Sequence, residues 1–425
     1  MIAWLLISFF VLLFLGVPIA MSLGLSAMGG ILFLGGGSTV TIAQRMFEGM
    51  NSFALLAIPL YTFAGFTMSK GGISKRLMDF CYSIVGHIYG GLAHVNVLSS
   101  MIFAGISGSA VADTAGVSGM FMPEMIRKGY SKNFTVAVTA ISSTIGIIIP
   151  PSIPMVVIAG ICGISTGKLF LGGIIPGILC GLAQMIVSYF LAKKEGVPKE
   201  PGHFTIGPVL HGLWESWPAL LMPIIIVGTI TMGIVSPTEA GVIAVVYSLF
   251  AGGIIYRELK WEDIKFAFAE TVRTSGRIFI VIGAAKLYTV MLTTAGFDKW
   301  VAKTMLGFST NPTVILIMIL LIFFIVTMFM ESIATLTLFM PILYPIALGV
   351  GIDPIVLSVL IIVVIGIGLV TPPVGMCIYV ACDLMDTTVG EVFPTLVPFI
   401  AATFVCIALM VAFPQLILLP TYLMA

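Results

Sequence analysis

The sequence predicts an all-α polytopic membrane protein. Of its 425 residues, 59% are hydrophobic and only 9% are charged, whereas a soluble domain carries about 25% charged residues. A transmembrane β-barrel would show short segments of alternating polarity instead. We therefore expect one membrane domain over 1–425. Apolar runs suited to a hydrocarbon core of ~30 Å recur along the chain: 1–37, 52–68, 134–164, 218–235, 240–256, 314–330, 355–370 and 396–425.

Composition and motifs exclude several other classes of protein. The net charge of +1 gives no electrostatic footprint for nucleic acid. Met1 to Ala3 lack the basic start of a signal peptide, so we expect the first helix to stay in the membrane. The six cysteines and four histidines show no metal-ligand spacing, and no nucleotide-binding motif is present. Neither an enzyme nor a bound cofactor is predicted.

Basic residues orient the chain. Fourteen of the 19 Lys and Arg residues lie in four clusters, within 70–76, 127–132, 193–199 and 257–277. The positive-inside rule predicts that all four are cytoplasmic. The regions around Lys168 and Lys299 then face outward. Two polar–apolar segments, about 75–91 and 257–275, are predicted to lie in the membrane interface as connecting helices.

The chain also contains an internal repeat. "PLYTFAGF" at 59–66 resembles "KLYTVMLTTAGF" at 286–297, a shared "FMP" aligns Pro123 with Pro341, and the double prolines begin at Pro150 and Pro372. These landmarks keep one order at offsets between 218 and 227 residues. The predicted repeats are about 52–192 and 277–421. Because the first "LYT" helix leads to a basic loop and the second to an outward one, the repeats should be inverted, as in many transporters.

Each repeat is predicted to contain a re-entrant helical hairpin and a proline-broken transmembrane helix. The hairpins are expected at about 94–128 and 312–350, because a polar turn in each lies too close to the next loop for a full crossing. The broken helices are expected at about 134–164, with "GIIIPPSIPM", and 354–382, with "GLVTPPVGM". A proline removes a backbone donor, and unpaired backbone in a membrane is tolerated where it lines a polar cavity.

These breaks suggest two sites for a hard cation such as Na⁺, formed by free carbonyls and nearby hydroxyls. In the first, Ser107, Gly108 and Ser109 would face a break that includes Gly146, Pro150 and Ser152. In the second, Glu331 and Ser332 would face Gly368 to Val374, where Thr371 adds a hydroxyl. Half-helix N-termini at the same depth could receive a substrate carboxylate.

Polar side chains near the breaks are substrate candidates: Ser109, Asp113, Ser332 and Thr371. Ionisable residues inside a membrane are functional hypotheses by default. Asp113 could equally pair with a backbone amide of its hairpin. Glu239 follows "SPT" and is expected to be a first-turn carboxylate with Ser236 or Thr238 as the helix cap.

Four segments together resemble the large membrane subunit of TRAP (tripartite ATP-independent periplasmic) transporters, of the DctM or SiaM type. They are "NSFALLAIPLYTFAG", "ISGSAVADTAGVSG", "SPTEAG" and "IGLVTPPVGM". The resemblance covers essentially the whole chain. It implies a bacterial inner-membrane importer that takes up a dicarboxylate, sialic acid or other sugar acid with Na⁺ by an elevator mechanism.

The resemblance also implies partners and ligands. A soluble periplasmic binding protein would deliver the substrate, and a separate small four-helix membrane subunit would brace the chain. Thr327 to Ser332 with Gly368, Thr371 and Val374 would hold the second ion. The family often has Gly and Asp where this chain has Thr327 and Glu331.

Three other functions remain open from the sequence. A stand-alone Na⁺/dicarboxylate symporter with the same repeats would need no binding protein. A channel would need a continuous polar pore, which the sparse intramembrane charge disfavours. An intramembrane enzyme would need a cluster of catalytic side chains, which the sequence does not suggest.

Overall fold

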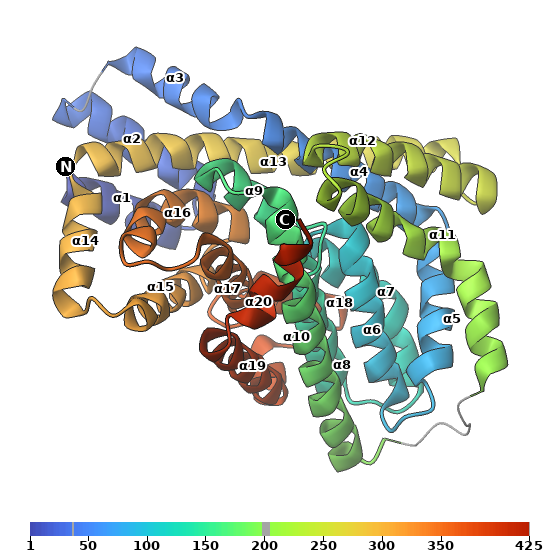
Figure 1. Cartoon of the computed structure of the whole chain (residues 1–425). Coiled ribbons are helices and arrows are strands. Elements are labelled where there is room, and N and C mark those ends of the chain that lie inside the picture. The colour runs from blue at the N-terminus through green and yellow to red at the C-terminus, as the bar shows by residue number, and fades with distance from the viewer. Residues whose placement is uncertain (36–37, 198–204, 425) are drawn as a thin grey trace.

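The computed structural model describes residues 1–35, 38–197 and 205–424, and every regular element in these ranges is a helix (Figure 1). Lys199, from the third basic cluster, lies outside the described residues. The elements of the first half of the chain are α1 (Ile2–Phe14), α2 (Ile19–Leu34), α3 (Thr39–Met50), η1 (Phe53–Leu56), α4 (Ala57–Lys70), α5 (Ile73–Val85), α6 (Gly91–Ser107), α7 (Ala110–Arg127), α8 (Lys132–Ser143), η2 (Thr144–Ile147), α9 (Ile153–Cys162) and α10 (Thr166–Glu195).

The second half of the chain is also helical. Its elements are α11 (Ile206–Thr231), α12 (Pro237–Phe250), η3 (Ala251–Ile255), α13 (Trp261–Thr294), α14 (Phe297–Phe308), α15 (Pro312–Thr327), α16 (Ser332–Gly349), α17 (Pro354–Gly368), α18 (Met376–Leu384), α19 (Val389–Ala412), α20 (Gln415–Leu418) and η4 (Leu419–Met424).

Seven helices in the described part of the chain are long and apolar enough to cross a membrane. The prediction of a polytopic helical membrane protein is therefore confirmed. Shorter apolar helices, such as α6, α9, α15 and α17, supply the hairpin arms and the half-helices. The seven long spans are Phe53–Lys70, Thr166–Glu195, Ile206–Thr231, Pro237–Ile255, Trp261–Thr294, Ser332–Gly349 and Val389–Ala412.

Several helices begin where the sequence provides a cap. Asp353 accepts hydrogen bonds from the Ile355 and Val356 amides and is followed by Pro354 at the first helical position, where proline loses no helical hydrogen bond. Ser236 and Glu239 form a capping box, in which each side chain accepts from the other residue's backbone N–H. The expected first-turn role of Glu239 is confirmed.

Two pairs of basic clusters lie at shared helix ends. Arg76 donates to Glu258 at 2.6 Å, which joins the first turn of α5 to the segment before α13. Ser131 at the start of α8 lies 3.0 Å from Glu195 at the end of α10. The membrane side of these ends stays a prediction.

Corresponding helices of the two halves make corresponding contacts. In the first half α6 packs on α7 and α8, and in the second half α15 packs on α16 and α17. The contacts between the halves also come in matching pairs. The hairpin arm α7 packs on α18 of the second half, and the corresponding arm α16 packs on α9 of the first half. In the same way α8 packs on α19, and the corresponding helix α17 packs on α10. Two related repeats would produce this exchange, but the repeat boundaries stay a prediction.

The two "LYT" tyrosines occupy similar environments. Tyr61 of α4 and Tyr288 of α13 are each 1% exposed. Tyr61 donates its hydroxyl to the Pro237 carbonyl at 2.8 Å, and Tyr288 donates to the Leu5 carbonyl at 2.8 Å. A buried tyrosine usually needs such a partner. The two tyrosines matched in the sequence therefore play the same structural part, since each is buried and bonds to a backbone carbonyl.

One expected boundary differs from the structure. The segment 257–275 is not a separate connecting helix, because Trp261–Thr294 forms one helix of 34 residues. That helix is about 51 Å long at 1.5 Å per residue. It runs along one edge of the molecule in Figure 1 and continues from the basic segment into the "LYT" segment without interruption.

Candidate functional site

The tip of the first hairpin is a two-residue turn, Gly108 and Ser109, between α6 and α7. Gly108 has a φ of +64°, a conformation that glycine adopts without the penalty that a side chain brings. A Cβ at this position would lie 2.7 Å from the Pro151 carbonyl oxygen. The Gly108 carbonyl also accepts a hydrogen bond from the Ile153 amide at 3.2 Å. The tip therefore rests directly on the first double proline.

The first break is buried and internally bonded. Helix α8 and the short η2 end at Ile147, and α9 begins at Ile153. Ser152 is fully buried, donates its hydroxyl to the Ile147 carbonyl at 2.6 Å and accepts from the Met155 amide. The hydroxyl thus spans the break and caps the half-helix that follows.

Asp113 joins the tip to the break. The Ser107 hydroxyl donates to Asp113 Oδ1, and the Ser109 amide donates to Ser107 Oγ at 3.2 Å. Asp113 Oδ2 is buried and has no hydrogen-bond partner within the described residues. It lies against Gly146, because a Cβ there would be 2.1 Å from Oδ2. An unpaired buried carboxylate oxygen is costly, so this position suits a cation.

The tip of the second hairpin also contacts its break. The Met328 carbonyl accepts from the Val374 amide at 3.0 Å and from the Gly375 amide at 3.4 Å. A Cβ on Gly368 would lie 2.6 Å from Thr327 Oγ1. The Thr327 hydroxyl itself donates to the Phe323 carbonyl one turn back. Thr327, Gly368 and Val374 are therefore brought together.

Glu331 caps the second arm of this hairpin. Its side chain accepts from the Ile333 amide at 2.9 Å, from the Ala334 amide at 3.4 Å and from the Ser332 hydroxyl at 2.6 Å. The carboxylate thus occupies the N-terminus of α16. Because the longer Glu side chain folds back onto its own helix, that helix end is closed to a substrate carboxylate.

Thr371 lies at the second break. Its hydroxyl donates to the Ile367 carbonyl at 2.7 Å, and its amide donates to the Gly368 carbonyl at 3.1 Å. The Cys377 amide donates across the break to the Leu369 carbonyl at 2.9 Å. Both double prolines contain a cis peptide bond.

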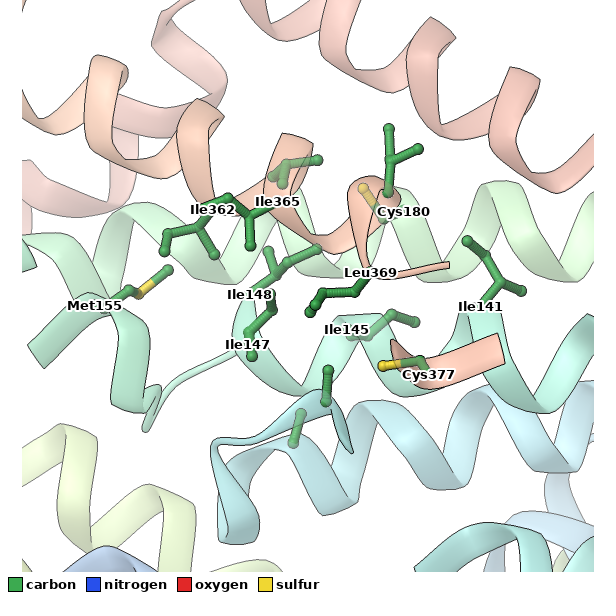
Figure 2. Close-up of a cluster of buried hydrophobic side chains, with 14 of the residues drawn as sticks. Ile141, Ile145, Ile147, Ile148, Met155, Cys180, Ile362, Ile365, Leu369 and Cys377 are labelled. Carbon is green, nitrogen blue, oxygen red and sulfur yellow. The ribbon is translucent and has the colours of Figure 1, made fainter. Parts of the chain in front are cut away.

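The two breaks share one apolar core. Figure 2 shows Ile145, Ile147 and Ile148 of the first break packed with Ile362, Ile365 and Leu369 of the second. A Cβ on Gly366 would be 3.3 Å from the Thr144 side chain, so the broken helices also touch. The two candidate ion sites are therefore joined by one close-packed core.

The second break is more open than the first. Val374 is 40% exposed and Tyr379 is 50% exposed. Beside them, α18 packs on α7. The outer face of α7 carries Gly116 and Gly119, which are exposed and where a Cβ would have no atom within 4 Å. Among the four substrate candidates, Asp113, Ser332 and Thr371 are buried and Ser109 is partly exposed.

The sequence prediction for the first ion site did not include Asp113. The available signal was its position four residues after the N-cap of α7, one helical turn into the hairpin arm and close to the tip. As a substrate contact Asp113 is disfavoured, because a carboxylate repels an organic acid. The expected pairing of Asp113 with a backbone amide is not found, since its bonded oxygen accepts from the Ser107 hydroxyl.

Comparison with known proteins identifies the family. The family described as "Tripartite ATP-independent periplasmic transporter, DctM component" matches residues 6–416. The sialic acid TRAP transporter large permease protein SiaM of Vibrio cholerae is 36% identical, over 96% of this chain and 95% of that protein. The C4-dicarboxylate large permease protein DctM of Pseudomonas aeruginosa is 36% identical, over 95% and 94%.

A longer relative and a solved structure are also similar. The isethionate TRAP transporter permease protein DctMQ of Oleidesulfovibrio alaskensis is 37% identical over 92% of this chain, which spans 62% of that protein. The YdaH transporter of Alcanivorax borkumensis matches with a TM-score of 0.58 at 12% identity, over 86% of each chain, which shows a shared fold.

These matches define the class of protein. The chain is a multi-pass protein of the bacterial inner membrane and a transporter component rather than an enzyme. The predicted resemblance is confirmed over nearly the whole chain. The chain belongs to the DctM component family of tripartite ATP-independent periplasmic transporters.

Proposed function

We propose that this chain is the large permease subunit of a Na⁺-driven importer of a small organic acid. The observation that carries this proposal is the seating of two polar hairpin tips on two proline breaks, with Ser107–Ser109 against Pro151 and Ile153, and Met328 against Val374 and Gly375. Backbone carbonyls and hydroxyls at such breaks provide the oxygen ligands that a hard cation prefers.

The first ion site would combine Ser107, Ser109 and Asp113 with the first break, near Gly146. The unpartnered Asp113 Oδ2 supplies the negative charge that offsets a bound cation. The second site would use the tip from Thr327 to Ser332 with Gly368, Thr371 and Val374. The Na⁺ ions are coupling ions, and no organic cofactor is proposed.

The substrate would carry a carboxylate, and the N-terminus of α18 is the best place to receive it. Ser109, Ser152 and Glu331 cap α7, α9 and α16 with their side chains. Helix α18 follows Gly375 and has no side-chain cap. The Gly375 amide bonds to the Met328 carbonyl and the Cys377 amide bonds to the Leu369 carbonyl. The Met376 and Ile378 amides, with the positive partial charge of this helix end, would therefore receive the anion. Nearby Val374 and Tyr379 are exposed, which supports access.

The names of relatives support a proposal about partners. The DctMQ protein is longer than this chain and is called a permease protein, and SiaM and DctM are called large permease proteins. We propose that a small four-helix membrane subunit and a soluble periplasmic binding protein complete the transporter. The substrate would then be a dicarboxylate, a sialic acid or another sugar acid, moved by an elevator motion of the hairpin unit.

The test is Na⁺ binding to the purified chain, followed by uptake. We expect Na⁺ to raise the unfolding temperature in a saturable way, while K⁺ and choline at equal ionic strength do not. Proteoliposomes with a small subunit and a binding protein should accumulate an organic acid under an inward Na⁺ gradient without ATP. Equal uptake under a K⁺ gradient would contradict Na⁺ coupling. Uptake by this chain alone would instead favour the stand-alone symporter.

A further inference from the structure

The outer face of α13 carries two arginines beside an apolar part of the neighbouring helix α4. This α13 face consists of exposed residues at helical spacing: Ala269, Val272, Arg273, Gly276, Arg277 and Ile280. Arg273 pairs with Glu270 at 2.6 Å. Arg277 forms no ion pair with any residue that the structure describes. Sequence clustering alone grouped both arginines with the cytoplasmic charges.

Contacts with α3 and α4 fix the height of this face. Phe266 stacks edge-on against Phe66 at 6.3 Å, and Lys70 lies 4.8 Å from the Phe266 ring. Further along α13, Gly283 and Lys286 contact Met46 and Gly49. The two segments are therefore antiparallel, and interpolation puts Arg273 and Arg277 beside residues 55–60. That stretch lies in the first half of the apolar span Phe53–Lys70, away from its Lys70 end.

Lipid cannot satisfy Arg277 at this height. Eleven residues separate Phe266 from Arg277, which is about 16 Å along a helix axis. Lys70 marks the polar end of the span beside Phe266. An arginine inside the membrane is expensive unless it pairs or reaches the interface. Headgroup phosphates lie at that interface, so they are poor partners for a group this far along the span.

We propose that the α13 face is the seat of a transmembrane helix from another protein, which brings a carboxylate to Arg277. This inference rests on the proposed function, which gives the chain a small membrane subunit as a partner. Ala269 and Gly276 lie on the same face as the arginines, and small residues let two helices approach closely. A Cβ on Gly276 would have no atom within 4 Å, so the surface is open at its centre.

A second copy of this chain fits this face poorly. A two-fold contact places the same patch on both sides, so Arg273 and Arg277 would meet the arginines of the other copy. The nearby acid Glu270 is already bonded to Arg273. A helix with a Glu or Asp complements the unpaired charge, and its bidentate bond to arginine would also orient it.

The experiment measures helix association in proteoliposomes. The full chain carries a donor fluorophore, and a synthetic Leu/Ala transmembrane helix carries an acceptor with one central Glu, Gln or Lys. We expect the Glu helix to bind roughly ten- to hundredfold more tightly than the Lys helix, the range for a hydrogen bond to a charged group. Arg277→Glu should reverse this preference, which mere misfolding would not do.

A matched pair of glycine variants tests the location. Gly276→Trp should abolish binding of the Glu helix, because it fills the open centre of the face. Gly390→Trp on α19 also enters open space and should leave binding unchanged. Equal affinities for the Glu and Lys helices would overturn the proposal. Disulfide cross-linking between copies through Gly276→Cys would also overturn it, because the occupant would be a second chain. No transport is measured, so failure here leaves the Na⁺ test of the proposed function standing.

Discussion

Asp113 accepts a hydrogen bond from Ser107 across the tip of the first hairpin. The two residues are separated by the turn at Gly108 and the cap at Ser109. This bond fixes one carboxylate oxygen and turns the other toward Gly146, where the described residues offer it no donor. The hairpin tip therefore places a carboxylate oxygen at the first break, where the proposed cation site would need one.

Asp113→Asn should abolish the first ion site while keeping its shape. The amide retains an acceptor for Ser107 but removes the charge that would offset Na⁺. We expect the half-saturating Na⁺ concentration for thermal stabilisation to rise at least about tenfold, from the loss of a charged contact worth ~1.5–3 kcal/mol. Asp386→Asn, at an exposed position with positive φ that Asn tolerates, is the control. An unchanged Na⁺ titration in Asp113→Asn would remove Asp113 from the site.

Gly146→Ala should disrupt the same site by a steric clash, without changing its charge. Its methyl group would collide with Asp113 Oδ2, which lies 2.1 Å from the ideal Cβ position. We expect weaker Na⁺ stabilisation and a lower unfolding temperature without Na⁺. The matched variant is Gly119→Ala on α7, where a Cβ meets open space. That change should stabilise the helix by up to ~1 kcal/mol. Wild-type Na⁺ affinity in Gly146→Ala would show that Asp113 can move away freely.

Glu331 should act mainly as a helix cap. Glu331→Ala removes the acceptor of two backbone amides and one hydroxyl, which should lower the free energy of unfolding by about 0.5–2 kcal/mol. Glu331→Asp should recover most of this stability, because Asp is a strong N-cap residue. Chemical or thermal denaturation in detergent would measure both. A loss of Na⁺ affinity in Glu331→Asp without a loss of stability would assign Glu331 to the ion instead.

The fold class followed from composition and from the paired landmarks. The double prolines and the small polar turns indicated where backbone leaves the helix, and the structure brings Gly108 against Pro151 and Met328 against Val374. Such features are local, so sequence reveals them. The 34-residue span of α13 was missed because its charged first half resembles an interfacial helix. Packing against α4 places this charged half beside an apolar span.

The contacts of Asp113 could not be predicted from the sequence. Its neighbours Ser107 and Gly146 are 6 and 33 residues away, and their meeting depends on how the hairpin seats on the break. The folding back of Glu331 onto α16 is a matter of side-chain length and rotamer, which residue type alone does not determine. The internal repeat also gave no sign that the two breaks differ in exposure. The second break is exposed at Val374, whereas the first break is buried.

Ser107 and Thr371 should belong to two separable Na⁺ sites. Ser107→Ala removes a possible ligand and leaves Asp113 Oδ1 without its donor, whereas Thr371→Val removes a hydroxyl whose present bond is the helical one to Ile367. Each loss should weaken Na⁺ activation of transport roughly ten- to hundredfold, with the larger effect at Ser107. Thr371→Ser keeps the oxygen and should resemble the wild type. Ser165→Ala, a cap outside the breaks, should leave Na⁺ activation unchanged.

The double variant decides whether the two sites act independently. The two broken helices touch at Thr144 and Gly366 and share the apolar core of Figure 2, so ion binding at one break can bias the other. Separate sites predict that the free-energy losses of Ser107→Ala and Thr371→Val add within about 0.5 kcal/mol. Coupling through the shared core predicts a deviation beyond that limit. The measurement is uptake titrated with Na⁺ for the wild type, both single variants and the double. If both single variants keep the wild-type half-saturation, neither hydroxyl is a ligand, and the ions would have to be held by backbone carbonyls and Asp113.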